Sequence, residues 1–161
     1  MLTLHLLRHA KTKQESHTGN DFHRELMEKG VAQANMLGNY LQLHHIELGY
    51  IICSSAVRTS QTQYIICKHV AEDCKPNFRK ELYLADYQTI LSELSGETSN
   101  IITLIGHNDG ISDLASYLSD EDIQMQTCEF LTFAFPFESW NMISRGTGIL
   151  SLRHRPEVYI P

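Results

Sequence analysis

The sequence predicts an α/β fold in three layers, with a mainly parallel central sheet, helices on both faces and an antiparallel edge strand. Two observations support this prediction: short apolar runs bounded by polar or turn residues, and amphipathic segments between them. Strands that alternate with helices form βαβ units, which bury a parallel sheet between two helical layers. A chain of 161 residues fits one domain, so we expect residues 1–161 to fold as a single unit.

The predicted strands are short and apolar. The runs Leu2–Leu7, Tyr50–Cys53 and Ile101–Ile105 are rich in Ile and Leu, which is typical of strands buried on both faces, although periodicity alone is also compatible with buried helix. Phe130–Phe135 and Gly148–Arg153 are two further strand candidates. The Gly-Thr-Gly sequence before the last run favours a turn, so we expect these two strands to form the antiparallel edge.

The segments between the strands carry helical patterns. In Glu28–Leu43, apolar residues recur near the 3.6-residue period with polar residues opposite them. The other predicted helices are Ala56–Val70, Thr89–Leu94 and Asp109–Leu118. The Ser-Ser pair at 54–55 is a good N-cap for the second helix.

The composition is that of a folded acidic protein. With 42 % apolar and 20 % charged residues, the chain is neither disordered nor of low complexity. The net charge is −6 and no run rich in Lys or Arg occurs, so we expect no nucleic-acid partner, and an anion site must be a local cluster of cations. No stretch approaches the roughly 20 apolar residues that span a bilayer, and the N-terminus does not resemble a signal peptide. We expect a cytoplasmic protein with no membrane partner.

The four cysteines stand at positions 53, 67, 74 and 128. They form no C-x-x-C pair and show no spacing typical of a metal site. Cys53 and Cys67 lie in apolar runs, where a free cysteine behaves as a small hydrophobic residue. We expect all four to be structural thiols in a reducing compartment.

Unusual polar residues follow the predicted strands at their carboxyl ends. Arg8 and His9 follow the first strand, Arg58 comes shortly after the second, and His107 follows the third. In an open α/β sheet, ligands bind in the crevice outside these ends. Taken singly, each residue also fits a packed or solvated side chain. Together, two arginines and two histidines from three distant segments predict a site for an anion with several oxygens.

The chemistry of these residues favours a phosphate. Arg58 falls in the first turn of a helix, where a cation opposes the helix dipole, and a phosphate bound at that N-terminus would explain it. The cation of Arg8 lowers the pKa of the neighbouring His9, and a neutral imidazole is a competent nucleophile towards phosphorus. His107 is either a second anion donor, when protonated, or only the start of the following helix.

Three motifs resemble those of the histidine phosphatase superfamily, which also includes cofactor-dependent phosphoglycerate mutase. The segment LRHAKT at 7–12 is similar to the signature L-x-R-H-G-x-[ST], SSAVRTSQT at 54–62 to the second-arginine segment, and LIGHN at 104–108 to the second-histidine motif. The short length, DFHRELMEKG at 21–30 and ELY at 81–83 resemble the small SixA-like phosphohistidine phosphatase branch.

The resemblance implies a role for each matching residue. His9 would attack phosphorus and carry the phosphoryl group as a covalent phosphohistidine, which water then hydrolyses. Arg8, Arg58 and His107 would hold the equatorial oxygens and stabilise the charge of the transition state. No metal or other cofactor is required, because these cations take that part.

Other positions have weaker assignments. Thr12 and Arg24 are candidates for binding the phosphate or substrate, although Thr12 also fits an ordinary loop hydroxyl and Arg24 an exposed partner of Asp21. Glu81 is the best-placed candidate for the acid that protonates a leaving group, and it fits a solvated glutamate equally well. Ala10 stands where the wider family mostly has Gly, and its methyl group is harmless if its φ is negative.

The favoured hypothesis is a metal-independent phosphatase that acts on phosphohistidine in a protein, such as a phosphotransfer domain. A phosphoramidate leaves more easily than an alkoxide once its ring is protonated, so it depends less on an acid. A small-molecule phosphomonoesterase of the same fold is the first alternative, and 161 residues leave little room for the cap it would need. A weakly catalytic phosphate-binding module would not need His9. A His-ligated metal hydrolase ranks last, because no H-x-H or H-E-x-x-H spacing occurs.

Overall fold

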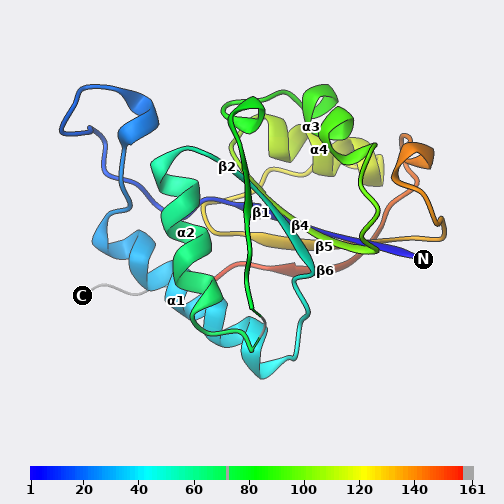
Figure 1. The fold of residues 1–161 in the computed structure, drawn as a ribbon, viewed down its shortest axis with the longest axis horizontal. Helices are drawn as coiled ribbons and strands as arrows, with labels where there is room; N and C mark the ends of the chain where they lie inside the picture. The colour runs from blue at the N-terminus through cyan, green and yellow to red at the C-terminus, as the bar shows by residue number, and fades with distance from the viewer. Residues whose placement is uncertain (72, 158–161) are drawn as a thin grey trace.

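A six-stranded mixed sheet forms the centre of the structure, a computed structural model that describes residues 1–71 and 73–157 (Figure 1). The strands are β1 (Leu2–Arg8), β2 (Tyr50–Ser54), β3 (Asn77–Arg79), β4 (Ile101–Gly106), β5 (Phe130–Phe135) and β6 (Ile149–His154). They lie in the order β3-β2-β4-β1-β5-β6. The first four run parallel, whereas β5 is antiparallel to β1 and β6 to β5. The predicted α/β class, with an antiparallel edge, is confirmed.

Helices cover both faces of the sheet (Figure 1). They are α1 (Glu28–Leu43), α2 (Val57–Cys67), α3 (Tyr87–Leu94) and α4 (Gly110–Ser119), with one-turn 3-10 helices η1 (Asp21–His23), η2 (Lys80–Leu82) and η3 (Trp140–Met142). The helix at 28–43 has the predicted bounds, and the other three differ from their predicted bounds by up to three residues. In the described part of the chain, no helix is long and apolar enough to cross a membrane.

The sheet divides the apolar interior into two cores. Leu4 and Leu6 of β1 point into the core under α3 and α4, whereas Leu7 points into the core under α1 and α2. Each of these leucines is fully buried, which stabilises the fold by about 1.5–3 kcal/mol per side chain. Because both faces are covered, β1 supplies buried leucines to both cores, and His5 between them is buried as well.

One local prediction is wrong, and one strand has no counterpart in the prediction. Ser54 and Ser55 do not cap α2: its N-cap is Ala56, with no side-chain hydrogen bond. Ser54 still belongs to β2, and its hydroxyl accepts the N–H of Ala56. The strand β3 was not predicted at all, because Asn77–Arg79 is only three residues long and lies at the edge of the sheet, without an apolar run.

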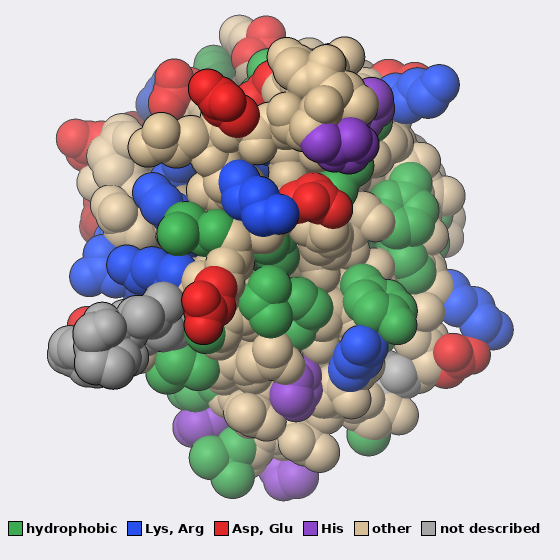
Figure 2. Space-filling view, turned by 90° about the vertical axis from the view of Figure 1, so that its left-hand side faces the viewer, with side chains coloured by type: hydrophobic (Ala, Val, Ile, Leu, Met, Phe, Trp, Pro, Cys, Tyr) green, Lys and Arg blue, Asp and Glu red, His purple; other side chains and the backbone are tan. Residues whose placement is uncertain are grey.

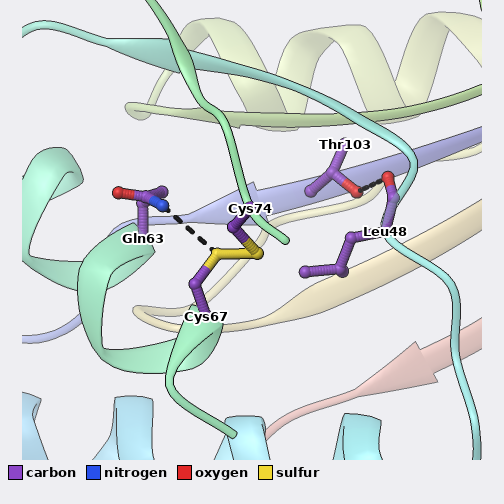
Figure 3. The surroundings of a disulfide bond; sticks show 5 residues. All are labelled: Leu48, Gln63, Cys67, Cys74 and Thr103. Carbon is purple, nitrogen blue, oxygen red and sulfur yellow. Dashed lines mark hydrogen bonds between the residues drawn. A yellow bond between two sulfur atoms is a disulfide. The ribbon is translucent and has the colours of Figure 1, made fainter. Parts of the chain in front are cut away.

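The cysteines also differ from the prediction of four free thiols. Cys67 and Cys74 form a disulfide that ties the end of α2 to the segment before β3, and the amide of Gln63 donates to the sulfur of Cys67 (Figure 3). Closing so short a loop is expected to stabilise the fold by about 2–3 kcal/mol. Cys53 and Cys128 are free and buried, and burial raises the pKa of both thiols. Cysteine usage therefore does not indicate a reducing compartment.

Two glycines bring loops close to the helices at the carboxyl ends of the strands. A Cβ atom at Gly30 of α1 would lie 1.9 Å from the carbonyl oxygen of Lys11, and one at Gly110 of α4 would lie 1.8 Å from that of Ala85. No side chain fits at either contact. The loops after β1 and η2 therefore lie directly against α1 and α4.

Candidate active site

A cavity of about 380 Å³ lies at the carboxyl ends of β1, β2 and β4. These ends point to the left in Figure 1, and Figure 2 views the molecule from that side. Six of the residues that the sequence singled out line the cavity: Arg8, His9, Thr12, Arg24, Arg58 and His107. The topology brings them together because β4 lies between β1 and β2, so that the three carboxyl ends are neighbours.

The end of β1 fixes Arg8 and His9. The N–H of His9 donates to the carbonyl of Gly106 at 3.1 Å, which continues the pairing of β1 with β4. One terminal nitrogen of Arg8 donates to the carbonyl of Met125 at 2.9 Å, whereas its Nε is buried and has no hydrogen-bond partner. The guanidinium of Arg8 is thus held by one terminal nitrogen, and its Nε–H has no acceptor.

The ring of His9 is set up as a nucleophile. Its Nδ1 lies 2.8 Å from the carbonyl oxygen of Ala10, which can only accept, so Nδ1 carries the proton and Nε2 has the free electron pair. Burial is the main cause that lowers the pKa of His9 to about 4, and the charges of Arg58 and Arg8 add to it. The predicted direction of this pKa shift is confirmed, but burial outweighs the neighbouring arginine. The ring is therefore neutral at pH 7.

Arg58 lies in the first turn of α2, as predicted, and is 2 % exposed. Its terminal nitrogens donate to the carbonyl oxygen of Asp21 at 2.9 Å and to the Asp21 carboxylate at 3.0 Å. The guanidinium lies 5.7 Å from the centre of the Tyr83 ring. Its Nε is buried without a partner.

Asp21 and Tyr83 are site residues to which sequence reasoning assigned no role. The Tyr83 hydroxyl donates to the Asp21 carboxylate, and this bond, with the charge of Arg58, lowers the pKa of Asp21 to about 2. The ring of Tyr83 also packs edge-on against His107. Both residues stand in segments that carry the family resemblance, and this is the sequence signal that could have identified them. Their contact with Arg58, however, appears only when the fold brings η1 and the end of η2 next to it.

His107 follows β4 and is buried. Its Nε2 lies 2.8 Å from the hydroxyl of Ser54, its Nδ1 has no partner, and its ring centre is 5.4 Å from that of His9. Burial and the charge of Arg58 lower its pKa to about 3. The ring is therefore neutral at pH 7 and can donate one N–H to an anion.

The remaining candidates are also placed. Arg24 lines the cavity and donates to Asp21 at 2.9 Å, and Thr12 lines it as well. Ala10 is buried outside the positive-φ region, so its methyl group is accommodated. Glu81 is not brought into the cavity: it is exposed on η2, and the neighbouring Leu82 is the residue of that turn that points inward.

Three of the residues that line this cavity each have a buried side-chain nitrogen without a hydrogen-bond partner. Among the described residues, Nε of Arg8, Nε of Arg58 and Nδ1 of His107 are the buried side-chain nitrogen or oxygen atoms that lack a hydrogen bond. A buried polar group without a partner costs about 1–3 kcal/mol, so native proteins rarely keep one without a function. Within the described residues, no group of three or more His, Cys, Asp or Glu side chains is arranged to hold a metal ion. The arrangement suits an anion with several oxygens.

Comparison with known families agrees with this geometry. Residues 4–103 match the model of the histidine phosphatase superfamily, branch 1. The chain belongs to this superfamily. This histidine phosphatase is 29 % identical over 115 residues, 70 % of either chain, to the uncharacterized protein Rv1276c of Mycobacterium tuberculosis.

Solved structures show the same fold. The protein histidine phosphatase SixA complexed with tungstate superimposes on this histidine phosphatase with a TM-score of 0.82 at 16 % identity, covering 96 % of this chain and 97 % of the other. A SixA from Nakamurella multipartitia also gives 0.82, at 23 % identity and with 98 % and 97 % covered. A phosphoserine phosphatase mutant from Entamoeba histolytica gives 0.62 at 16 % identity, with 95 % and 96 % covered.

Proposed function

We propose that this histidine phosphatase works without a metal, forms a covalent phosphohistidine at His9 and dephosphorylates phosphohistidine on a protein. The observation that carries the proposal is that Arg8, Arg58 and His107, each with a buried nitrogen that lacks a partner, line the same cavity as the neutral ring of His9. A phosphoryl group has three equatorial oxygens to accept from them.

In the first step, the electron pair on Nε2 of His9 attacks phosphorus. A bond forms between Nε2 and phosphorus, and the bond from phosphorus to the leaving nitrogen breaks. Its electron pair goes to that nitrogen, and the other nitrogen of the leaving ring already carries a proton, so a neutral imidazole leaves. Arg8 and Arg58 neutralise the oxygens that carry the charge. In the tautomer that this step uses, Nε2 of His107 accepts from the Ser54 hydroxyl 2.8 Å away, and Nδ1 carries the proton that is donated to a phosphoryl oxygen.

In the second step, water attacks the phosphorylated His9. The oxygen of the water bonds to phosphorus while the bond between Nε2 and phosphorus breaks. The electron pair of the broken bond returns to Nε2, and inorganic phosphate leaves with the protons of the water. The carbonyl of Ala10 keeps the proton on Nδ1, so the free ring is restored in the tautomer that starts the cycle. Thr12 and Arg24 are placed to contact the phosphate or the rest of the substrate.

The carboxylate in the cavity favours phosphohistidine as the substrate. An alkyl phosphate needs an acid to protonate its leaving oxygen, but the pKa of Asp21 is about 2, so this group is ionised at neutral pH. Glu81 is exposed outside the cavity lining, so we assign it no proton transfer. The ring of a phosphohistidine can take its proton from water before its bond to phosphorus breaks, so it needs no acid from the protein. The similar SixA structure is described as that of a protein histidine phosphatase.

A small-molecule phosphomonoesterase is the second candidate, because a phosphoserine phosphatase shares the fold. Measuring the rate of phosphate release from two substrates distinguishes these two functions. The substrates are a histidine-phosphorylated phosphotransfer domain and p-nitrophenyl phosphate, both in EDTA, with wild type, His9→Ala and the exposed-histidine control His17→Ala. We expect faster turnover of the phosphorylated domain, unchanged in His17→Ala and at least about 1,000-fold slower in His9→Ala. A requirement for a divalent metal, or full activity of His9→Ala, would contradict the proposal.

A further inference from the structure

A second cavity, of about 450 Å³, adjoins the one that holds His9. Lys11 and Thr127 line both cavities and form the wall between them. Lys29 of α1 and Arg155, which follows β6, line only the second cavity. On the face drawn in Figure 2, several Lys and Arg side chains gather at the left. The two cavities therefore meet at Lys11 and Thr127.

The floor of the second cavity is held by a buried amide. Gln33 of α1 accepts the N–H of Lys11 at 2.9 Å, and its amide nitrogen donates to the hydroxyl of Thr127 at 3.3 Å. Both hydrogen-bonding ends of this one side chain are thus used to hold the two residues of the shared wall. The hydrogen bonds of Gln33 therefore position both the loop after β1 and the wall of the second cavity.

The charges on the two sides of the catalytic cavity differ. The second cavity carries the cations of Lys11, Lys29 and Arg155 against the carboxylate of Glu157. A third cavity, of about 520 Å³, shares Asp21 and Arg24 with the catalytic cavity, and in its lining Glu15 and Asp21 stand against the single cation of Arg24. An anionic extension of the substrate is therefore attracted toward the second cavity and repelled from the third.

The cations of the whole chain are concentrated here. The protein has a formal charge of −6, so its overall field repels anions, and only local clusters of cations attract them. The catalytic cavity and the second cavity together hold six of the 13 Lys and Arg residues: Arg8, Lys11, Arg24, Arg58, Lys29 and Arg155. Two of the six, Lys29 and Arg155, do not line the catalytic cavity.

We propose that the second cavity is an anion subsite that binds another anionic group of the substrate, a carboxylate or a phosphate, beside the phosphoryl group at His9. The inference rests on the proposed function and adds the substrate class: a phosphorylated molecule that carries a second anion. Arg155 offers a planar pair of donors to such a group, and Lys11 and Lys29 offer mobile point charges. An acidic side chain next to a phosphohistidine and the second phosphate of a small bisphosphate share this chemistry.

The test compares the double variant Lys29→Ala/Arg155→Ala with the matched control Lys75→Ala/Arg145→Ala, which removes two exposed cations elsewhere. The first substrate pair is two phosphohistidine peptides, one flanked by Asp and one by Asn. The second pair is fructose 1,6-bisphosphate and fructose 6-phosphate. At low salt, we expect the subsite variant to raise KM at least about fivefold for the more anionic member of a pair. Its kcat for that member, and both KM and kcat for the less anionic member, should change less than about twofold.

The substrate pair whose KM responds identifies the source of the anion. A response of the peptide pair indicates an acidic protein segment, and a response of the sugar pair indicates a small bisphosphate. Equal KM values for wild type, control and subsite variant would overturn the subsite and leave the proposed function standing. A wild type that turns over none of the four substrates would instead contradict the proposed function. Calorimetric titration with the two peptides carrying a non-hydrolysable phosphonate then decides the subsite: preferential binding of the acidic peptide, lost in the subsite variant, supports it, and equal binding overturns it.

Discussion

Arg79 and Arg58 lie at the same edge of the sheet but differ in how many of their guanidinium nitrogens have a hydrogen-bond partner. Arg79 ends β3 beside Ser54 of β2, and each nitrogen of its guanidinium has a partner: Nε donates to Asn77, one terminal nitrogen to Glu93 and the other to Glu97. Arg58 gives its terminal nitrogens to Asp21 and leaves Nε buried without a partner. Every guanidinium nitrogen of Arg79 has a hydrogen-bond partner within the protein, whereas Nε of Arg58 has none.

Two buried histidines repeat the comparison. The ring nitrogens of His5 lie 2.9 Å from the Thr132 hydroxyl and 3.0 Å from the carbonyl of Glu47. His107 has a partner only at Nε2. Burial lowers the pKa of both, to about 4 for His5 and about 3 for His107. A lowered pKa therefore does not separate a structural histidine from a functional one, but an unpartnered nitrogen does.

The arginine pair gives the largest expected effect. Arg58→Ala removes a charge from the phosphoryl oxygens, and we expect kcat/KM to fall by roughly 1,000-fold. Arg79→Ala should keep kcat/KM within about twofold and lower the free energy of unfolding by about 2 kcal/mol, since it leaves Glu93 and Glu97 without their cation. Urea unfolding and phosphate release measure the two effects. A comparable loss of activity in both variants would contradict the distinction.

The histidine pair gives the next largest effect. His107→Ala is expected to lower kcat by roughly 100-fold, because one donor to the transition state is lost. His5→Ala should leave kcat within about threefold and lower the free energy of unfolding by about 1–3 kcal/mol, since the Thr132 hydroxyl and Glu47 carbonyl lose their partner. If His107→Ala turns over at the wild-type rate, its unpartnered nitrogen is not a site donor.

Acid is expected to weaken the fold through the buried histidines. The pKa values of His5, His9 and His107 are about 4, 4 and 3 in the folded protein, below the usual value of 6.5. Between pH 6.5 and about 4 the unfolded chain binds more protons, so their stabilisation is complete above pH 6.5 and is lost as the pH falls. Each residue contributes about 1.4 kcal/mol per pH unit in this window. Urea unfolding of wild type and His5→Gln between pH 7 and 4.5 should show a smaller slope in the variant, and equal slopes would refute the assignment.

Tyr83→Phe gives the smallest expected effect. The hydrogen bond from the Tyr83 hydroxyl is the largest cause of the low pKa of Asp21, so its loss should raise that pKa toward the usual range. Asp21 stays ionised at pH 7 and still binds Arg58, so kcat/KM should change less than about threefold. Carboxyl-carbon NMR titration measures the pKa of Asp21 directly. An unchanged titration would show that the hydroxyl does not control this group.

The sequence predicts those parts of the fold and site that depend on local pattern. The helix Glu28–Leu43 and the strand Phe130–Phe135 are long and periodic or strongly apolar, and their bounds match. Arg8, Arg58 and His107 meet because each stands at or shortly after the carboxyl end of a parallel strand, and these ends lie at one edge of the sheet.

Other features depend on contacts between distant segments. The pairing of Cys67 with Cys74 requires the end of α2 to return toward the segment before β3, which spacing does not show. Asp21 and Tyr83 gain their role only when η1 and the end of η2 close over Arg58. Glu81 has a suitable side chain and position in the sequence, but the turn of η2 directs Leu82 inward instead.

The most direct test of the central claim is to trap the phosphorylated enzyme. Wild type, His9→Ala and His17→Ala are mixed with a phosphohistidine peptide, quenched in alkali within milliseconds, and analysed by mass spectrometry and by phosphorus–nitrogen NMR correlation. We expect one phosphoryl group on Nε2 of His9 in wild type and in His17→Ala, and none in His9→Ala. A phosphoryl group on another residue, or phosphate release with no phosphorylated enzyme at any time, would contradict the account.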